Sequence, residues 1–218
     1  MDHDAVPEAL AVPVLETARL VLRGWRESDL APFAALNDDP AVMEYFPGRL
    51  TRAESDALVA RATEHFARHG FGWWAVEVRD TADFLGFVGL LVPSFEAHFT
   101  PCVEIGWRLA REHWGRGYAP EAARAALRFG FERLALDQIV SFTVPANLKS
   151  RRVMEKIGMH REPADDFDRL SLPEGHPLRR HVLYRLNRAD WERAAGGRAV
   201  LGANDKTSGA NGKQHSRS

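Results

Sequence analysis

The feature that most constrains the fold is a glycine-rich turn between a strand and a helix. Residues 103–109 are strand-like, Gly115 and Gly117 follow in a short loop, and a helix is predicted to begin near Pro120. Proline suits the first turn of a helix, where its missing N–H would have had no intrahelical partner. Such a unit directs several backbone N–H groups, and the positive end of the helix dipole, at one point in space.

Backbone amides in this arrangement are suited to binding a phosphate group, and glycine lets the chain approach it closely. We predict four backbone donors, with the side-chain charge of the first as an addition: Arg116, Gly117, Tyr118 and Ala119. A tight turn that needs two glycines is the alternative. The spacing differs from the dinucleotide fingerprint Gly-x-Gly-x-x-Gly and from the P-loop, and no second βαβ half follows.

A second segment lies downstream. Asn147 follows a strand that ends at Pro145 and precedes a helix over 148–157, which is predicted to end at a left-handed Gly158. Asn147 is suited to capping this helix, with Ser150 in its first turn. The other interpretation is that the Asn147 amide reaches a ligand passing the end of the strand.

The remaining pattern is a mixture of strands and helices. A Thr-x-x-Glu capping box at Thr51 predicts a helix that ends at Gly70, and another short helix follows Ser28. The predicted strands are 19–23, 73–78, 84–92, 103–109, 138–144 and 182–186. This order predicts an α+β domain with a mostly antiparallel sheet and helices on its faces.

Length and composition fit one domain. The chain has 218 residues, of which 45% are hydrophobic and 27% charged. We expect a single domain over 13–193, with disorder at 1–12 and at 194–218, where Gly, Asn, Ser, Lys and Arg dominate. The net charge of −1 supplies no field that would draw the protein to nucleic acid or to a membrane.

The single cysteine, Cys102, excludes an internal disulfide and a multi-thiolate metal site. We expect a small core residue here, in a cytoplasmic protein, because no signal-like start or long apolar span is present. His98, His113 and His160 show no metal-ligand spacing, so no metal is expected.

Together the two segments resemble the GNAT superfamily of acyl-CoA-dependent N-acyltransferases, over about residues 14–192. Trp114 stands where that family's motif has Gln or Arg, a departure typical of the branch that resembles the ribosomal-protein N-terminal acetyltransferases RimJ and RimL. Further motifs similar to this branch are Thr17-x-Arg19-Leu20-x-Leu22-Arg23-x-Trp25 with Asp29, Asp39-Pro40-x-Val42-Met43, and Glu104-Ile105-Gly106-Trp107.

The resemblance implies a central sheet splayed at the cofactor site and acetyl-CoA as co-substrate. It places the pantetheine arm beside strand 103–109, with Asn147 near the arm and Ser150 near the sulfur. The implied cofactor-binding residues are Trp107, Arg108, Leu109, Gly115, Arg116, Gly117, Tyr118, Ala119, Asn147 and Ser150.

The implied reaction is direct attack of an acceptor amine on the thioester in a ternary complex. We predict Glu104 as the base, directly or through water, because it lies in an otherwise apolar strand where desolvation raises the pKa of a carboxyl. A carboxylate on a solvated strand face is the alternative. Ser150 is the predicted donor to the departing thiolate, and Tyr184 is a weaker candidate.

The acceptor is less constrained by the sequence. Trp73 and Trp74 face opposite sides of a strand, and we predict Trp74, with Phe46, in the acceptor wall, core packing being the alternative. The loop 171–177 is suited to closing over the site. The acceptor is a protein N-terminus or a small-molecule amine, and the protein a monomer or homodimer. A non-catalytic acyl-CoA sensor and an NAD(P)-dependent oxidoreductase are the competing functions.

Overall fold

The structure, a computed structural model, describes residues 12–194. The predicted disordered termini lie outside this range, except for Val12 and Ala194 at its two ends. In chain order the elements are β1 (Leu15–Glu16), β2 (Leu20–Arg23), α1 (Glu27–Asp38), α2 (Arg52–His69), β3 (Trp73–Val78), β4 (Phe84–Leu91), β5 (Glu104–Leu109), η1 (Arg111–His113), α3 (Tyr118–Glu132), β6 (Gln138–Thr143), α4 (Leu148–Lys156), β7 (His160–Arg161), η2 (Pro163–Asp165), β8 (Phe167–Asp168) and β9 (Arg180–Asn187).

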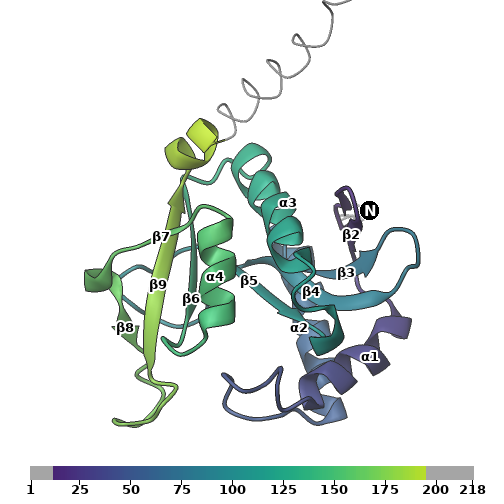
Figure 1. The fold of residues 1–218 in the computed structure, drawn as a ribbon, viewed down its shortest axis with the longest axis horizontal. Coiled ribbons are helices and arrows are strands. Elements are labelled where there is room, and N and C mark those ends of the chain that lie inside the picture. Colours follow the sequence, from purple (N-terminus) through teal and green to yellow (C-terminus); the bar gives the residue numbers. More distant parts are fainter. Residues whose placement is uncertain (1–11, 195–218) are drawn as a thin grey trace, which may run out of the picture.

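The strands form one sheet in two halves (Figure 1). The order is β1-β2-β3-β4-β5-β6-β9-β7, with β8 pairing β9. Every neighbouring pair is antiparallel except β5 and β6, which are parallel and share one registered pair, Glu104 opposite Val140. The prediction of a mixed, mostly antiparallel sheet that splays at one place is confirmed, and the splay lies between β5 and β6.

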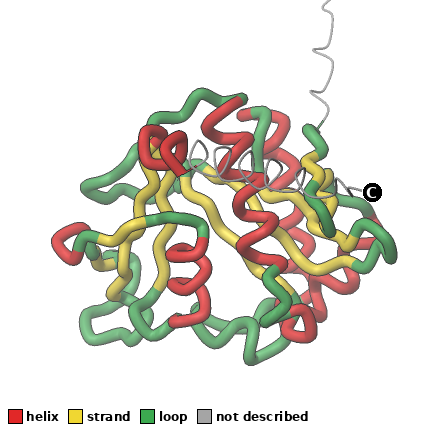
Figure 2. The backbone as a smooth tube through the Cα atoms, turned by 45° about the horizontal axis from the view of Figure 1, so that its top comes forward, coloured by secondary structure: helices red, strands yellow, loops and turns green. Residues whose placement is uncertain are grey.

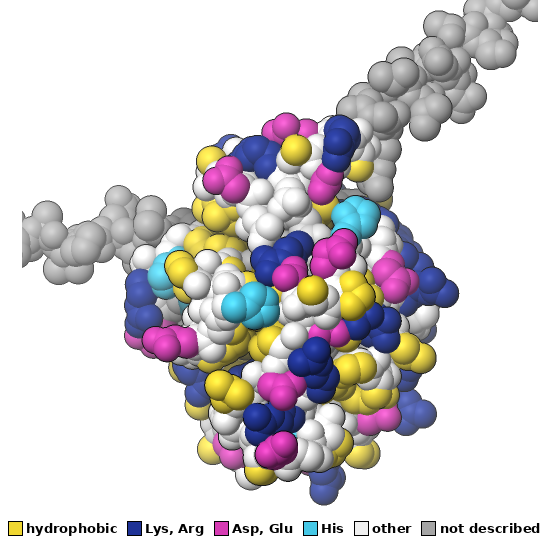
Figure 3. Space-filling view, turned by 90° about the vertical axis from the view of Figure 1, so that its left-hand side faces the viewer, with side chains coloured by type: hydrophobic (Ala, Val, Ile, Leu, Met, Phe, Trp, Pro, Cys, Tyr) yellow, Lys and Arg dark blue, Asp and Glu magenta, His cyan; other side chains and the backbone are white. Residues whose placement is uncertain are grey.

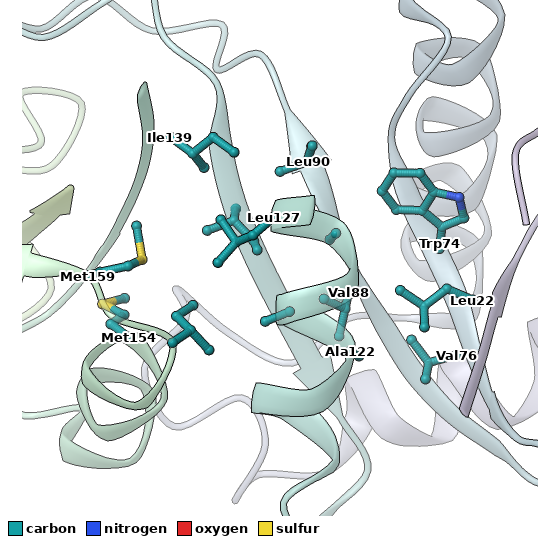
Figure 4. Close-up of a cluster of buried hydrophobic side chains, with 14 of the residues drawn as sticks. Leu22, Trp74, Val76, Val88, Leu90, Ala122, Leu127, Ile139, Met154 and Met159 are labelled. Atoms are coloured by element: carbon teal, nitrogen blue, oxygen red, sulfur yellow. The ribbon is translucent and has the colours of Figure 1, made fainter. Parts of the chain in front are cut away.

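Helices cover both faces of the sheet (Figure 2). Helix α3 packs on β4 and β5, and small residues such as Ala122 and Ala126 let it approach them closely. Figure 4 shows the core beneath it, where Leu127 of α3, Leu90 of β4 and Ile139 of β6 lie together. Burying a leucine side chain stabilises the fold by about 1.5–3 kcal/mol, so this layer holds α3 in place across the two halves.

On the opposite face, α1 is fixed by a buried ion network. The Arg23 guanidinium on β2 donates to Asp29 of α1 at 2.7 Å and to Glu77 of β3 at 2.6 Å. All three side chains are almost completely buried. Removing one member would leave an uncompensated buried charge, which is strongly destabilising. The network therefore sets the position of α1 and of the loop that follows it.

Two predicted helix starts need correction, and the first is that of α1, which begins at Glu27 rather than after Ser28. Thr51 and Glu54 form the expected capping box of α2, and Gly70 has the left-handed φ of 74° that ends it. Helix α3, however, begins at Tyr118, two residues before the predicted start at Pro120. Gly117 is its N-cap with φ 80°, so Pro120 lies inside the first turn.

Candidate functional site

A cavity of about 850 Å³ opens where β5 and β6 diverge. Its floor is the face of β5 that carries Glu104, Gly106 and Arg108. One wall, here called the glycine-loop side, comes from residues 113–120 and 141–156. The other, the aromatic side, comes from residues 41–47, Trp73, Phe87, 91–95, 169–178 and His181. The two walls differ in how they are built.

The glycine-loop side presents backbone N–H groups. Gly115 and Gly117 have φ of 76° and 80°, which side-chain-bearing residues rarely adopt, and an added Cβ at Gly115 would meet nothing within 4 Å. Conformation rather than space therefore requires these glycines. Because Pro120 has no N–H and the Glu121 amide bonds the Gly117 carbonyl, the amides left for a ligand here are the four predicted ones, those of Arg116, Gly117, Tyr118 and Ala119.

Side chains that the sequence prediction did not place hold this loop. Arg19 donates through Nη1 to the carbonyl of Arg116 at 3.1 Å and pairs with Glu121 at 2.6 Å. Its guanidinium also lies 4.7 Å from the ring centroid of Tyr118. Arg116 itself is exposed and does not line the cavity, so the predicted side-chain contribution of Arg116 is not supported. The sequence signal was present in Thr17-x-Arg19, whose role was not recognised.

Trp114 has a structural role at the start of the loop. Its indole Nε1 donates to the carbonyl of Leu109 at 2.8 Å, and Lys149 lies over its ring at 4.3 Å. The carbonyl of Leu109, a member of the implied cofactor-binding set, therefore already has one donor. Trp107, the other apolar member of that set on β5, lines the cavity.

The divergence of β5 and β6 begins just after their one registered pair. Ser141 of β6 donates its hydroxyl to the Ile105 carbonyl at 2.8 Å, and this bond marks the last link between the strands that the described residues show. Beyond it, the β6-facing edge of β5 at Trp107 lines the cavity. An extended ligand with amide groups fits along such an edge, since strand edges carry alternating N–H and C=O groups.

Helix α4 closes this side. Asn147 accepts from the Ser150 amide at 3.2 Å through Oδ1 and donates to the Thr143 hydroxyl at 3.1 Å. The capping interpretation of Asn147 is thus confirmed, while both Asn147 and Ser150 also line the cavity. Three basic side chains of α4, missed from the sequence, line its mouth: Lys149, Arg152 and Lys156.

Tyr184 lies away from the cavity. It is buried, its hydroxyl donates to Glu155 at 3.4 Å, and Arg151 donates to that hydroxyl at 3.3 Å. Tyr184 does not line the cavity, whereas Ser150 does. Of the two predicted thiol-side donors, the geometry favours Ser150.

Glu104 lies at the floor of the cavity, and the pKa of its carboxyl is raised. Burial raises the pKa of its carboxyl to about 8, and the charge of Arg169 opposes that shift only in part. This partly buried position agrees with the sequence prediction of a desolvated carboxyl. A carboxyl with a pKa near neutrality can both accept and return a proton at physiological pH.

Arg108 requires a correction to the predicted cofactor-binding set. Its side chain extends to the aromatic side, where Nη1 donates to Asn37 Oδ1 at 2.6 Å. The guanidinium lies 4.0 Å from the ring centroid of Phe46 and 5.7 Å from that of Phe87. Burial lowers the Arg108 pKa to about 10. Strand alternation explains the error, because residue 108 faces away from the core side occupied by its neighbours 107 and 109.

Trp74 is likewise misplaced by the prediction. It is fully buried in the core against Phe66 and Phe129, and its indole N–H donates to the Pro13 carbonyl at 2.7 Å. Trp73 lines the cavity instead, stacked on Phe87 with ring centroids 4.5 Å apart. Phe46 lines the cavity as predicted. Both faces of β3 are buried, so the sequence pattern could not distinguish the two tryptophans.

The segment after β8 supplies the rest of the aromatic side. Ser171 and Leu172, from the predicted closing loop, line the cavity, together with Arg169 and His181, which were missed. His176 accepts the Leu178 amide at 3.1 Å and does not line the cavity, as expected of a loop residue. Cys102 packs on an aromatic cluster, and burial raises its thiol pKa to about 11.

Within residues 12–194, no helix is long and apolar enough to cross a membrane. The same residues contain no group of three or more His, Cys, Asp or Glu side chains arranged to hold a metal ion.

The sequence and the fold of this chain are similar to those of known proteins. The family model for the acetyltransferase (GNAT) domain matches residues 19–160. The protein YkkB of Bacillus subtilis is 37% identical over 147 residues, covering 67% of this chain and 84% of YkkB. The FsC-acetyl coenzyme A-N(2)-transacetylase of Aspergillus fumigatus is 31% identical over 194 residues, covering 84% of this chain and 80% of that enzyme.

Solved structures share the fold. A GNAT-family acetyltransferase from Bacillus anthracis superposes with a TM-score of 0.68 at 26% identity, covering 81% of this chain and 99% of that one. Ribosomal-protein-S5-alanine acetyltransferase from Vibrio fischeri gives 0.64 at 18% identity, covering 82% and 98%. Spermidine N-acetyltransferase from Vibrio cholerae, in complex with CoA and spermine, gives 0.63 at 21% identity, covering 80% and 99%.

Proposed function

The chain belongs to the GNAT acetyltransferase family, and on this premise we propose that it transfers an acetyl group from acetyl-CoA to a primary amine by direct attack in a ternary complex. The observation that carries the proposal is the two-walled cavity at the β5–β6 splay. One wall offers backbone donors, the other offers side chains, and a carboxyl of altered pKa lies between them.

The glycine-loop side fits the cofactor. The backbone amides at the start of α3 converge where a pyrophosphate would accept them, with the helix dipole adding to the attraction. The basic side chains of α4 suit the phosphate groups. The edge of β5 at Trp107 and the position of Asn147 suit the pantetheine arm.

Glu104 on the floor of the cavity and Ser150 of α4 suit the two proton-transfer tasks of the reaction. The amine nitrogen forms a C–N bond to the acetyl carbon, the C–S bond breaks, and the nitrogen gives up a proton. Glu104 takes that proton, directly or through water, because its raised pKa makes it a base near neutral pH. Ser150 donates to the departing thiolate from the start of α4. Cys102, with a thiol pKa of about 11, is poorly suited to carry the acetyl group as a thioester.

The acceptor is either a protein N-terminus or a small-molecule amine. Membership of the RimJ/RimL-like branch belongs to this proposal and rests on the sequence motifs. A cytoplasmic location and a monomeric or homodimeric state are also part of this proposal. On the face that carries β7, β8 and β9, basic and acidic side chains are interspersed (Figure 3), which gives no single-signed surface for a strongly charged macromolecule there.

Thiol release from acetyl-CoA, measured with a panel of N-terminal peptides and small amines, tests the function. Amine-dependent release is the expected result. Tight acetyl-CoA binding without release for any amine would instead favour the non-catalytic sensor on the same fold. Binding of NAD(P) in preference to acetyl-CoA, read as a thermal shift, would favour the oxidoreductase.

A further inference from the structure

The cavity holds a half-buried cation, Arg108, that has no ion-pair partner within residues 12–194. Arg108 crosses the aromatic side below the rings of Phe46 and Phe87. Among residues 12–194 the Arg108 side chain makes no ion pair, and its one hydrogen-bond partner is Asn37. Its Nε is buried without any partner. Buried charges are normally paired, so this guanidinium lacks the anion that its environment calls for.

Neighbouring residues fix the position of the Arg108 guanidinium without neutralising its charge. Asn37 is fully buried, and its amide nitrogen donates to Ser55 of α2 at 2.8 Å, which fixes the amide oxygen toward Arg108. The Phe46 ring then lies on the guanidinium. An amide oxygen and a ring face stabilise a cation weakly, and they leave planar N–H donors for a stronger acceptor.

The floor between Arg108 and Glu104 is open. An added Cβ at Gly106 would meet only Glu104 Oε1, at 3.8 Å. Gly106 also lies opposite Gly89 of β4, so two neighbouring strands lack side chains at this point. Glu104 and Arg108 are four residues apart on one face of β5, or about 13 Å along the strand. An acceptor can therefore lie along this floor with one end at each charged group.

The overall charge of the cavity agrees with an anionic acceptor. Five of its lining side chains are Lys or Arg, and two, Glu44 and Glu104, are acidic. Three of the five basic side chains lie on α4 at the glycine-loop side. The remaining two, Arg108 and Arg169, line the aromatic side. A polycationic amine would lie against like charge there.

We propose that Arg108 binds a carboxylate of the acceptor, so that the substrate is an amine carrying a carboxylate remote from the nitrogen that is acetylated. The guanidinium offers two parallel N–H groups to a carboxylate, a geometry that gives both attraction and orientation. Bound in this way, the acceptor directs its amine toward the Glu104 end of the floor. This proposal rests on the proposed acetyl transfer and names its substrate class.

The test compares matched acceptors on the unaltered protein. δ-Aminovalerate and free dipeptides are each measured against their carboxamide twins, with kcat and KM determined separately. We expect KM for the carboxylate to be about 10- to 100-fold lower than for its amide, because a hydrogen bond to a charged group contributes on that scale. Equal KM values for the twins would overturn the proposal.

Variants assign the effect to Arg108. In Arg108→Gln, KM for the carboxylate should rise to the value for the amide, while the Kd of acetyl-CoA and KM for the amide stay unchanged. Arg108→Lys should keep part of the preference, since it retains a point charge without the planar donors. Arg49→Gln, a matched loss of charge on an exposed residue that pairs with Asp38, should keep all of it. An equal rise of both KM values in Arg108→Gln would show a structural role and contradict the proposal.

A binding measurement separates this inference from the proposed function. Calorimetry with N-acetyl-δ-aminovalerate and its carboxamide needs no turnover. Preferential binding of the carboxylate without any acetyl transfer would overturn the transferase and support the anion site. Transfer with no carboxylate preference in either assay would overturn the anion site and leave the transferase standing.

Discussion

The two walls of the cavity present different chemical groups to a ligand: mainly backbone groups on the glycine-loop side and side chains on the aromatic side. The glycine-loop side positions backbone groups, by two left-handed glycines and a helix start that lie within one short stretch of chain. The aromatic side is assembled from side chains of β3, β4, β5 and β9 and from three loops that are distant in the sequence, 41–47, 93–95 and 169–178. Backbone groups are the same in every sequence that adopts this conformation, so the glycine-loop side can bind the same ligand when residues differ. The ligand of the aromatic side can change when its side chains are substituted.

Paired tryptophan variants test the aromatic side most strongly. Trp74→Ala should lose about 3–5 kcal/mol of unfolding free energy, because a fully buried indole leaves a cavity in the core. Trp73→Ala should unfold at nearly the wild-type denaturant concentration and raise the acceptor KM instead. Urea titration and steady-state kinetics on both variants measure this. Equal loss of stability in the two would show that Trp73 is also a core residue.

Glu104→Gln should lower kcat about 100-fold at neutral pH, because a positioned general base contributes on that scale, while the Kd of acetyl-CoA stays within about twofold. With a pKa of about 8, wild-type kcat should rise with pH and level off above 8. In the variant, kcat should no longer rise with pH in this range. An unchanged pH–rate profile in the variant would remove Glu104 from the mechanism.

Unfolding gives a second measure of the same carboxyl. The native pKa of Glu104 lies above its ordinary value of 4.5, so the native state holds its proton more tightly than the unfolded state does. This contribution to stability is complete below pH 4.5 and is lost, at about 1.4 kcal/mol per pH unit, as the pH rises to about 8. Glu104→Gln should therefore gain stability over wild type across that window.

Gly117→Val should weaken acetyl-CoA binding about tenfold or more, because a β-branched residue at φ 80° is strained and displaces the first amides of α3. Gly70→Val, with φ 74° at the end of α2 and open space around it, carries similar strain away from the cavity. Calorimetric titration should show weakened binding in the first variant alone. A similar Kd for both would mean that the glycine loop is only a turn.

Gly106→Ala should produce the smallest effect, a rise of a few fold in acceptor KM. A methyl group fits without a clash there, but it narrows the floor between Glu104 and Arg108. Melting temperature and acetyl-CoA affinity serve as controls and should not change. An unaltered KM would place the acceptor elsewhere in the cavity.

The contrast between the walls also explains what the sequence could predict. Periodicity and capping residues predicted the main helices and strands, and the spacing of Gly115 and Gly117 predicted the amide cradle, because these signals are local. The assignment of Trp74 failed since both faces of β3 are buried. Arg169 and His181 were missed because their proximity to the site arises only when distant segments pack together, whereas Arg19 belongs to a motif whose role was not recognised.

In the proposed reaction, acetyl-CoA and the acceptor occupy the two walls of the cavity at the same time. Initial velocities measured over a matrix of acetyl-CoA and acceptor concentrations test this directly. Double-reciprocal lines that intersect are the predicted result, since direct transfer needs a ternary complex. Parallel lines, the signature of a covalent acetyl-enzyme that forms before the acceptor binds, would contradict the claim.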